Sequence, residues 1–168
     1  MDKQRQHHLF QTIVEQHKGI MFKVARLYCA AEDDRQDLIQ EMLIRIWHAL
    51  HRYNDEYKMS TWLYRISLNV AISYYRKSSS KKVNFIPLND SIIEFPSEEK
   101  SEKEHNLNLL EQFISELKEL DKALMILYLE DKSHGEIAEI LGMTVSNVGT
   151  KIGRIKDKLK TRFSQIKS

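Results

Sequence analysis

This 168-residue sequence contains little of what interrupts helices or crosslinks a chain: five glycines, two prolines and a single cysteine. So few helix-breaking residues favour long helices. One cysteine excludes an intramolecular disulfide framework and is typical of a reduced, intracellular protein. The formal net charge of +2 excludes a strongly basic chain, so any contact with nucleic acid must come from local clusters of charge.

Long apolar runs are also absent. No run approaches the roughly 20 residues that a membrane-spanning helix needs. The opening residues, MDKQRQHHLFQ, show no apolar segment of a secretory signal. Hydrophobic residues still make up 42% of the chain, a normal share for a globular protein. These features predict a soluble, cytoplasmic, folded protein without membrane insertion.

Apolar residues recur every three or four positions in two parts of the chain, and no alternating strand pattern is seen. We expect one or two helices over residues 9–28 and one each over residues 35–51 and 60–77, and helical spacing resumes at residue 107. We therefore predict an all-α fold of two small helical domains, residues 1–77 and 107–168, joined by a flexible linker over residues 78–106.

The boundaries of these helices carry recognisable residues. Asp33 or Asp34 is placed to cap the second helix, and Ser60 or Thr61 to cap the third. Residues 78–106 combine a Ser-Lys run, both prolines and mixed charge. Structureless loops of this length are uncommon inside compact domains, which favours a linker. The sequence leaves open whether the two domains pack against each other.

The segment SHGEIAEILGMTVSNVGTKIGRIKDKLKTRF, which starts at Ser133, has the pattern of a helix-turn-helix. Ser133 with Glu136 three residues later has the spacing of a capping box. Gly142 stands where a glycine commonly ends a helix. Thr144 or Ser146 then caps the second helix. Two helices with a short glycine-containing turn are therefore expected here.

The second helix of this segment divides into two faces. Its apolar face consists of Val148, Ile152, Ile155 and Leu159, and its opposite face of Asn147, Thr150, Lys151, Arg154 and Lys158. Polar side chains can bond base edges in the major groove, while Lys and Arg can hold phosphates. An ordinary αα-hairpin is the alternative. Gly149 and Gly153 each cost about 1 kcal/mol in a helix interior relative to alanine, unless a close backbone approach requires them.

The helix over residues 35–51 carries polar residues on the side away from its apolar stripe: Asp37, Gln40, Glu41, Ile44 and His48. A solvated acidic face is the simpler interpretation of this side. An isoleucine among the charges, however, suits a protein interface better than solvent.

The helix over residues 60–77 contains four aromatic residues, three basic residues and no acid. Its predicted core face consists of Leu63, Ile66, Val70 and Tyr74, and another face carries Arg65, Asn69, Ile72 and Arg76. Trp62 lies in the first turn, beside an aromatic loop. Aromatic rings next to basic side chains are typical of sites that hold unstacked bases, although a tryptophan at a helix start is more often part of the core.

Taken in order, these motifs closely resemble the extracytoplasmic-function (ECF, group 4) sigma-70 family of bacterial RNA polymerase sigma factors. The motifs are DLIQE at 37–41, TWLYRI at 61–66, YYRK at 74–77, EIAEILG at 136–142 and SNVGTKIGR at 146–154. The resemblance covers the chain from about Leu9 to Phe163. The sequence departs from the family pattern at Leu68, where a basic residue is common, and at Ser73, where an acid is common.

The resemblance implies a sigma factor that binds core RNA polymerase, directs it to promoters and promotes their melting. The sigma-2-like domain would bind the polymerase β′ subunit through Asp37, Gln40, Glu41, Ile44 and His48. It would read and melt the −10 element through Tyr57, Trp62, Arg65, Asn69, Ser73 and Arg76. The sigma-4-like domain would read the −35 element through Ser146, Asn147, Thr150, Lys151, Arg154 and Lys158.

The implied partners are core polymerase, including its β and β′ subunits, promoter DNA and an anti-sigma factor. No cofactor, metal, small-molecule substrate or enzymatic activity is expected. A regulator that binds DNA without joining polymerase is one alternative, but it leaves the acidic helix and the Trp62 region unexplained. An enzyme is another, but His48, His51 and His134 are scattered, and no HExxH, CxxC or glycine-rich phosphate loop appears.

Overall fold

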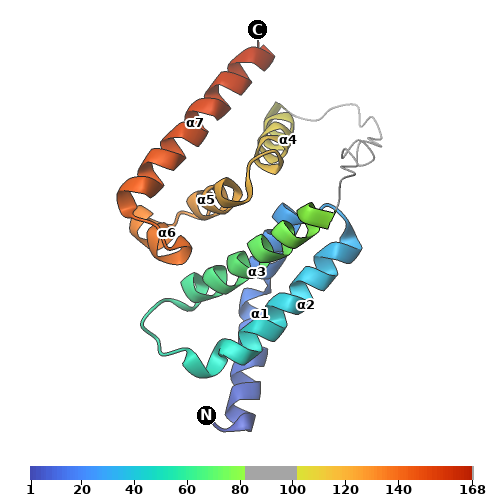
Figure 1. The fold of residues 1–168 in the computed structure, drawn as a ribbon, viewed down its shortest axis with the longest axis vertical. Coiled ribbons are helices and arrows are strands. Elements are labelled where there is room, and N and C mark those ends of the chain that lie inside the picture. Colours follow the sequence, from blue (N-terminus) through green and yellow to red (C-terminus); the bar gives the residue numbers. More distant parts are fainter. Residues whose placement is uncertain (82–101, 168) are drawn as a thin grey trace.

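The computed structural model describes residues 1–81 and 102–167, and within those ranges helices are the only regular secondary structure (Figure 1). Its elements are α1 (Lys3–Tyr28), α2 (Glu32–Ala49), η1 (Leu50–Arg52), α3 (Met59–Lys81), α4 (Glu102–Ser115), α5 (Glu119–Leu129), α6 (His134–Leu141) and α7 (Val145–Lys167). The prediction of an all-α fold is therefore confirmed. We call α1–α3 the N-terminal unit and α4–α7 the C-terminal unit.

The helices extend into both ends of the range expected to be a linker. Helix α3 continues to Lys81 and α4 begins at Glu102, whereas the sequence placed the boundaries at residues 77 and 107. The rest of that expected linker, residues 82–101, lies outside the described residues. The division into two domains remains a prediction.

Helix α1 is one uninterrupted helix of 26 residues, and it packs with α2 and α3 around a shared core. The core side chains of this unit include Val24, Leu38, Met42, Ile46 and Leu68, none of which is exposed. Ile46 and Met42 lie one turn apart on α2, as the apolar stripe predicted. Burial of this stripe leaves the opposite face of α2 open to solvent.

The expected caps of α2 and α3 are wrong. Helix α2 begins at Glu32, and its N-cap residue, Ala31, makes no side-chain capping bond. The acids of this segment instead lie in the first turn, where negative charge interacts favourably with the helix dipole. Helix α3 begins at Met59, one residue before Ser60; the Ser60 hydroxyl accepts from Lys132, and Thr61 is buried.

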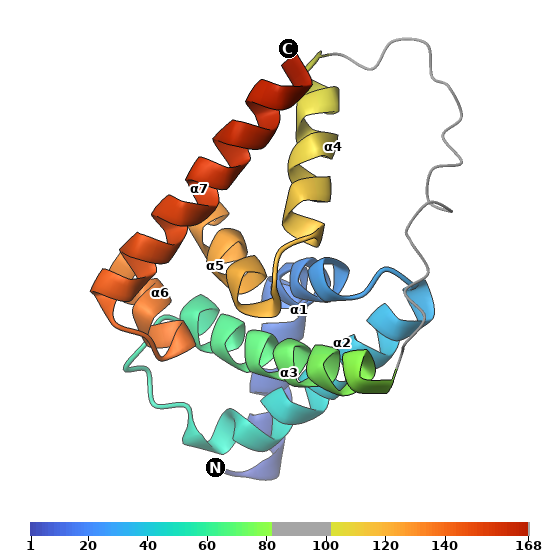
Figure 2. The same ribbon diagram turned by 45° about the horizontal axis from the view of Figure 1, so that its top comes forward.

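The expected core face of α3 is also partly wrong. Leu63 is buried, but Ile66, Val70 and Tyr74 are only partly so. The fully buried side chains are instead Tyr64, Ser67, Leu68 and Ala71. Helix α3 is covered by α1 and α2 on one side and by α5 and α6 on the other (Figures 1 and 2). An apolar residue at position 68 is thus explained by burial.

The N-caps and the C-terminal glycine of the helix-turn-helix are confirmed, but the return bond of a capping box, from the Glu136 carboxylate to the Ser133 N–H, is not among the hydrogen bonds of the described residues. The Ser133 hydroxyl accepts a hydrogen bond from the Glu136 backbone N–H at 3.1 Å. The Glu136 carboxylate lies 3.8 Å from Lys132 Nζ. Gly142 ends α6 in the left-handed conformation with φ +66°. The Thr144 hydroxyl accepts from the Asn147 N–H at 3.1 Å. Thr144 rather than Ser146 is therefore the cap of α7.

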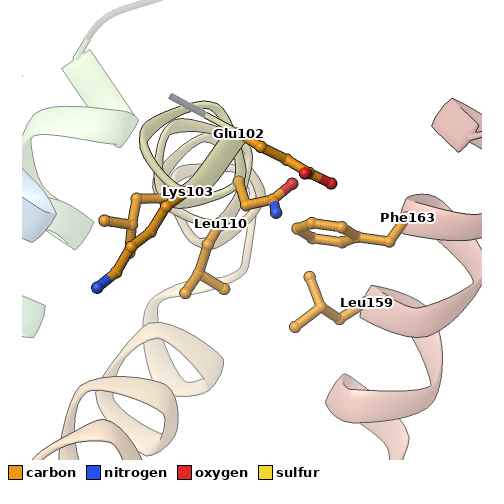
Figure 3. Close-up of a pocket in the computed structure, with 7 residues that line it drawn as sticks. Glu102, Lys103, Leu110, Leu159 and Phe163 are labelled. Carbon is orange, nitrogen blue, oxygen red and sulfur yellow. The ribbon is translucent and has the colours of Figure 1, made fainter. Parts of the chain in front are cut away.

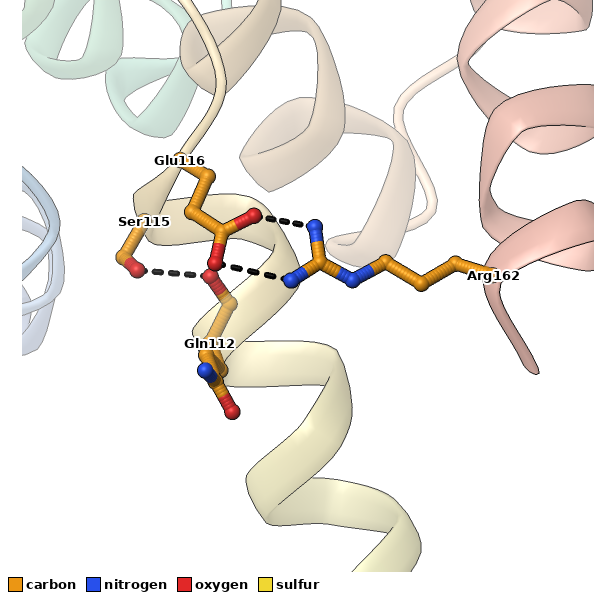
Figure 4. Close-up of polar contacts among 4 residues, drawn as sticks. All are labelled: Gln112, Ser115, Glu116 and Arg162. Atoms are coloured by element: carbon orange, nitrogen blue, oxygen red, sulfur yellow. Dashed lines mark hydrogen bonds and ion pairs between the residues drawn. The ribbon is translucent and has the colours of Figure 1, made fainter. Parts of the chain in front are cut away.

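The C-terminal unit closes around the apolar face of α7. Val148, Ile152 and Ile155 are buried as predicted, and Leu159 is partly buried. Near the end of α7, the Arg162 guanidinium forms a two-pronged ion pair with the Glu116 carboxylate (Figure 4), one bond measuring 2.9 Å. This pair connects α7 to the turn between α4 and α5.

Two glycine-to-alanine substitutions should have opposite effects on stability. Gly142→Ala places a Cβ in a left-handed backbone and should destabilise the chain by about 1–2 kcal/mol. Gly153→Ala is the matched control, because no atom lies within 4 Å of its added Cβ. It should stabilise the helix interior by about 1 kcal/mol. Urea denaturation followed by circular dichroism measures both; equal effects at the two positions would contradict the assigned turn.

Candidate functional site

The five residues of α2 proposed to bind polymerase are all exposed on one side of the helix. Ile44 leaves 51% of its surface exposed, close in sequence to the acidic Glu41. Arg45 Nε lies 3.4 Å from the Glu41 carboxylate, so that acid is only loosely paired at the surface. The face therefore combines an exposed aliphatic side chain with carboxylates that a partner can reach.

A groove of about 740 Å³ runs between α2 and α3. Asp37, Glu41 and His48 line it from α2, and Asn69 and Ser73 line it from α3. The structure thus brings three residues of the proposed polymerase site together with two of the proposed −10 site. The partly buried side chains of α3 form part of its floor, which explains why periodicity assigned them to the core.

A smaller pocket of about 210 Å³ lies at the start of α3. The loop residue Tyr57 lines it together with Trp62 and Arg65. The Trp62 ring packs on Tyr53 with 5.1 Å between centroids, and the Tyr53 hydroxyl donates to the Tyr57 carbonyl at 3.1 Å. These contacts order the aromatic loop, so the pocket has a preformed wall of rings beside a guanidinium.

The C-terminal unit contributes to the same pocket. Glu139 and Ile140 of α6 line it opposite the α3 residues. The Glu139 carboxylate accepts a hydrogen bond from the Tyr57 hydroxyl, and this contact raises the pKa of Tyr57. The sequence did not indicate Glu139, because an exposed acid in the first helix of a helix-turn-helix has no distinguishing pattern.

The far end of the −10 face is also in contact with the C-terminal unit. Arg76 Nε donates to the Glu119 carboxylate at 3.0 Å. The bond from Arg76 lowers the pKa of Glu119, since it stabilises the ionised carboxylate. The six −10 candidates are therefore spread along α3 and its preceding loop, with α6 at one end and α5 at the other.

Between these two ends, a buried lysine holds the units together. Lys122 is 5% exposed, and its ammonium lies 5.6 Å from the ring centre of Tyr28 and 5.2 Å from that of Tyr75. It also donates to the Leu27 carbonyl at 3.4 Å. Burial lowers the pKa of Lys122. The only sequence signal for this role was a single cation inside the apolar run of α5.

The proposed −35 face lies on the exposed side of α7, opposite its buried stripe. Ser146, Asn147, Thr150, Arg154 and Lys158 are exposed, and Lys151 is partly so. Lys156 lies off this face and donates to the Tyr128 hydroxyl at 3.1 Å. The face therefore combines hydroxyl and amide groups near the helix start with cations further along, which suits base edges and phosphates respectively.

An apolar groove of about 690 Å³ separates α4 from the end of α7. Leu110 points into it from α4, and Leu159 and Phe163 from α7 (Figure 3). Leu107, which also lines it, is 52% exposed. The sequence predicted the periodic leucines of α4 but not that they would leave a groove.

Within residues 1–81 and 102–167, no helix is long and apolar enough to cross a membrane. In the same ranges, no group of three or more His, Cys, Asp or Glu side chains could hold a metal ion. His48 lines the α2–α3 groove, and the His134 ring lies near Gly149.

A helix-turn-helix with an exposed polar and basic face, attached to a second helical unit with an aromatic and basic pocket, defines a DNA-binding transcription factor. Two family models match the chain: sigma-70 region 2 over residues 13–81 and sigma-70 region 4 over residues 107–159. The chain belongs to the sigma-70 family, and its relatives place it among the ECF sigma factors. It acts in promoter-specific initiation of transcription by RNA polymerase.

Relatives of the full chain are sigma factors. The chain is 29% identical to RNA polymerase sigma factor SigV of Bacillus subtilis over 153 residues, which cover 90% of this chain and 89% of SigV. It is 25% identical to the ECF sigma factor SigM of the same organism, covering 92% and 96% of the two chains.

Solved structures show the same fold. CnrH in complex with the cytosolic domain of CnrY superposes with a TM-score of 0.67 at 22% identity, covering 95% of this chain and 90% of that one. The sigma factor RpoE of Bartonella quintana, in complex with the anti-sigma factor NepR, gives 0.71 at 19% identity, covering 92% and 95%.

Proposed function

We propose that the exposed face of α2 binds core polymerase, through its β′ subunit, while α3 and its preceding loop read and open the −10 element. The observation that carries this proposal is the α2–α3 groove, in which Asp37, Glu41 and His48 face Asn69 and Ser73. A protein docked on α2 would thereby fix the position of any DNA that follows α3.

The pocket at the start of α3 suits a base that has left the duplex. Extruding a base costs a few kcal/mol, which contacts with the flipped base can offset. Stacking on an aromatic ring contributes about 1–3 kcal/mol per base, and Trp62 and Tyr57 supply rings. Arg65 lines the same pocket and is placed to follow a phosphate.

The exposed face of α7 is proposed to read the −35 element as duplex DNA. Contacts with phosphates would set the register, and the side chains near the helix start would contact base edges. Two modest sites on one chain strengthen each other through effective concentration. The N-terminal unit would then be delivered to the −10 element by the C-terminal unit.

We also propose that an anti-sigma factor regulates this protein, that it acts in the cytoplasm and that it is not an enzyme. Two structural relatives were solved in complex with CnrY or with the anti-sigma factor NepR, which supports a partner of that kind. A factor that works on promoter DNA together with polymerase meets both partners in the cytoplasm.

Run-off transcription on genomic fragments tests the proposed function directly. Core polymerase with this chain should produce discrete transcripts whose upstream sequences share two elements, and core alone should not. The same templates then serve to define the promoter. A chain that binds DNA but neither binds core nor supports transcripts would instead be a regulator that acts without joining polymerase.

Reversing the charge of Glu41 should weaken binding to core polymerase about tenfold, because a carboxylate on the proposed docking face becomes a cation. Co-purification and fluorescence titration of labelled Glu41→Lys with core measure this. Glu15→Lys is the control, since Glu15 is an exposed acid on a different helix, α1. Equal losses in the two variants, or none in either, would contradict docking through α2.

Removing Arg154 should weaken binding to the −35 duplex about equally across sequences if its guanidinium holds a phosphate. It should also lower the slope of log affinity against log salt by about one. Lys160→Ala is the matched control, because Lys160 is an exposed cation on α7 outside the proposed face. An unchanged salt slope in Arg154→Ala would rule out the phosphate contact.

A further inference from the structure

Gly149 lies at the edge of the exposed face of α7, one helical turn from Ser146 and from Gly153. Glycine is unfavourable in a helix interior relative to alanine. A Cβ added to Gly149 would lie 3.5 Å from Nδ1 and 3.7 Å from Cε1 of His134. A single methyl group fits at these ordinary contact distances, but a longer side chain would have to displace the imidazole or point elsewhere. Position 149 of α7 is therefore covered by a side chain of α6.

Gly153 is different, although it lies only one turn further along α7. It is exposed, and no atom lies within 4 Å of a Cβ added there. The open backbone at Gly153 thus continues into a place where His134 stands in for a missing side chain. Helix α6 in this way adds a polar group to a surface that the sequence assigned to α7 alone.

The imidazole lies on the opposite edge of this surface from Lys151. Successive residues of a helix are rotated by roughly 100°, so positions 149 and 151 point roughly 160° apart, with Thr150 between them. A helix that enters the major groove lies between the two phosphate backbones that border the groove. Lys151 is placed to meet one of these backbones, and His134 is placed to meet the other.

The His134 side chain is available to a ligand. It is exposed, and within residues 1–81 and 102–167 no hydrogen bond or ion pair engages it. Its ring therefore keeps its hydrogen-bonding capacity while resting on Gly149. This distinguishes it from Lys156, whose ammonium bonds the Tyr128 hydroxyl at 3.1 Å.

The charged groups around α6 leave the imidazole to an anion from outside the chain. On its own segment, the Glu136 carboxylate lies 3.8 Å from Lys132 Nζ. Glu130, at the end of α5, bonds Lys23 at 2.6 Å. The elements packed against α6 are α3, α5 and α7; besides Glu130, they bring Arg65, which shares a pocket with α6, and Lys151. The two acids are thus paired with lysines rather than with His134.

A histidine changes charge in the range between about pH 8 and pH 5. The protonated ring has two N–H donors, and charge-assisted hydrogen bonds to phosphate are stronger than neutral ones. An imidazole that contacts a phosphate should therefore bind DNA more tightly as the pH falls, because the form that gains the proton is the form that the phosphate favours.

We propose that His134 is a further residue of the −35 site: it lies over Gly149 and binds a DNA phosphate on the edge of the major groove opposite Lys151. The inference rests on the −35 recognition proposed above. Gly149 keeps the place open for the imidazole, and the affinity of the site for duplex DNA depends on pH through this one group.

The variant His134→Gln tests this contact, because it removes the titrating ring and keeps a polar side chain. His105→Gln is the matched control, since His105 is the other histidine of the C-terminal unit and is exposed on α4. His134→Lys supplies a cation whose charge does not change over this range. The probe is a fluorescein-labelled −35 duplex from a promoter found by run-off transcription. Anisotropy with the full chain gives its affinity at pH 6 and pH 8 over a salt series.

The wild type should bind the duplex about fivefold more tightly at pH 6 than at pH 8, the size of one exposed charge pair. His134→Gln should lose most of this difference, and at pH 6 its slope of log affinity against log salt should be lower by about one. His105→Gln should behave as the wild type. His134→Lys should bind at pH 8 about as tightly as the wild type does at pH 6. Circular dichroism establishes that the variants keep their helical content.

Three results would overturn the phosphate contact while transcription from the same promoter shows that the proposed function stands. The first is a wild-type pH dependence and salt slope in His134→Gln. The second is an equal loss in His105→Gln, which would show a general effect of charge. The third is a loss in His134→Gln that is the same at both pH values, which would show a packing role for the ring. Absence of transcripts with core polymerase would instead reject the proposed function and this contact with it.

Discussion

The contact between the two units is centred on one buried ammonium group, that of Lys122. Lys122 enters from α5 between the rings of Tyr28 and Tyr75, and its hydrogen bond to the Leu27 carbonyl helps offset the cost of leaving water. A cation held in this way is favourable only while both units are in contact. It therefore fixes the position of α5 on α1 and α3, and with it the acids that follow on α5 and α6.

Helix α3 consequently contributes side chains to three different surfaces. One side packs on α1 and α2, another contacts the C-terminal unit, and a third lines the groove that opens between α2 and α3. This crowding explains why Leu68 is fully buried and why side chains such as Val70, assigned to the core by periodicity, lie at the floor of the groove.

Features that depend on nearby residues were predicted well. The caps by Ser133 and Thr144 and the left-handed Gly142 each involve a few consecutive residues. The caps predicted for α2 and α3 were wrong: both helices begin before the predicted cap residues, and the Ser60 hydroxyl instead accepts from Lys132, 72 positions away. The candidate site residues are exposed or partly exposed where the sequence placed them, and their roles remain proposals.

The sequence by itself determined the helices, the helix-turn-helix and the family, because periodicity, turn residues and ordered motifs act over short stretches of chain. Only the tertiary structure decided that the two units pack together, that Lys122 is buried and that Glu119 and Glu139 reach the proposed −10 site. Lys122 and Tyr28 are 94 positions apart in sequence. A contact between such distant segments produces no periodic pattern in the nearby sequence. The burial of Lys122 is therefore seen only in the folded structure.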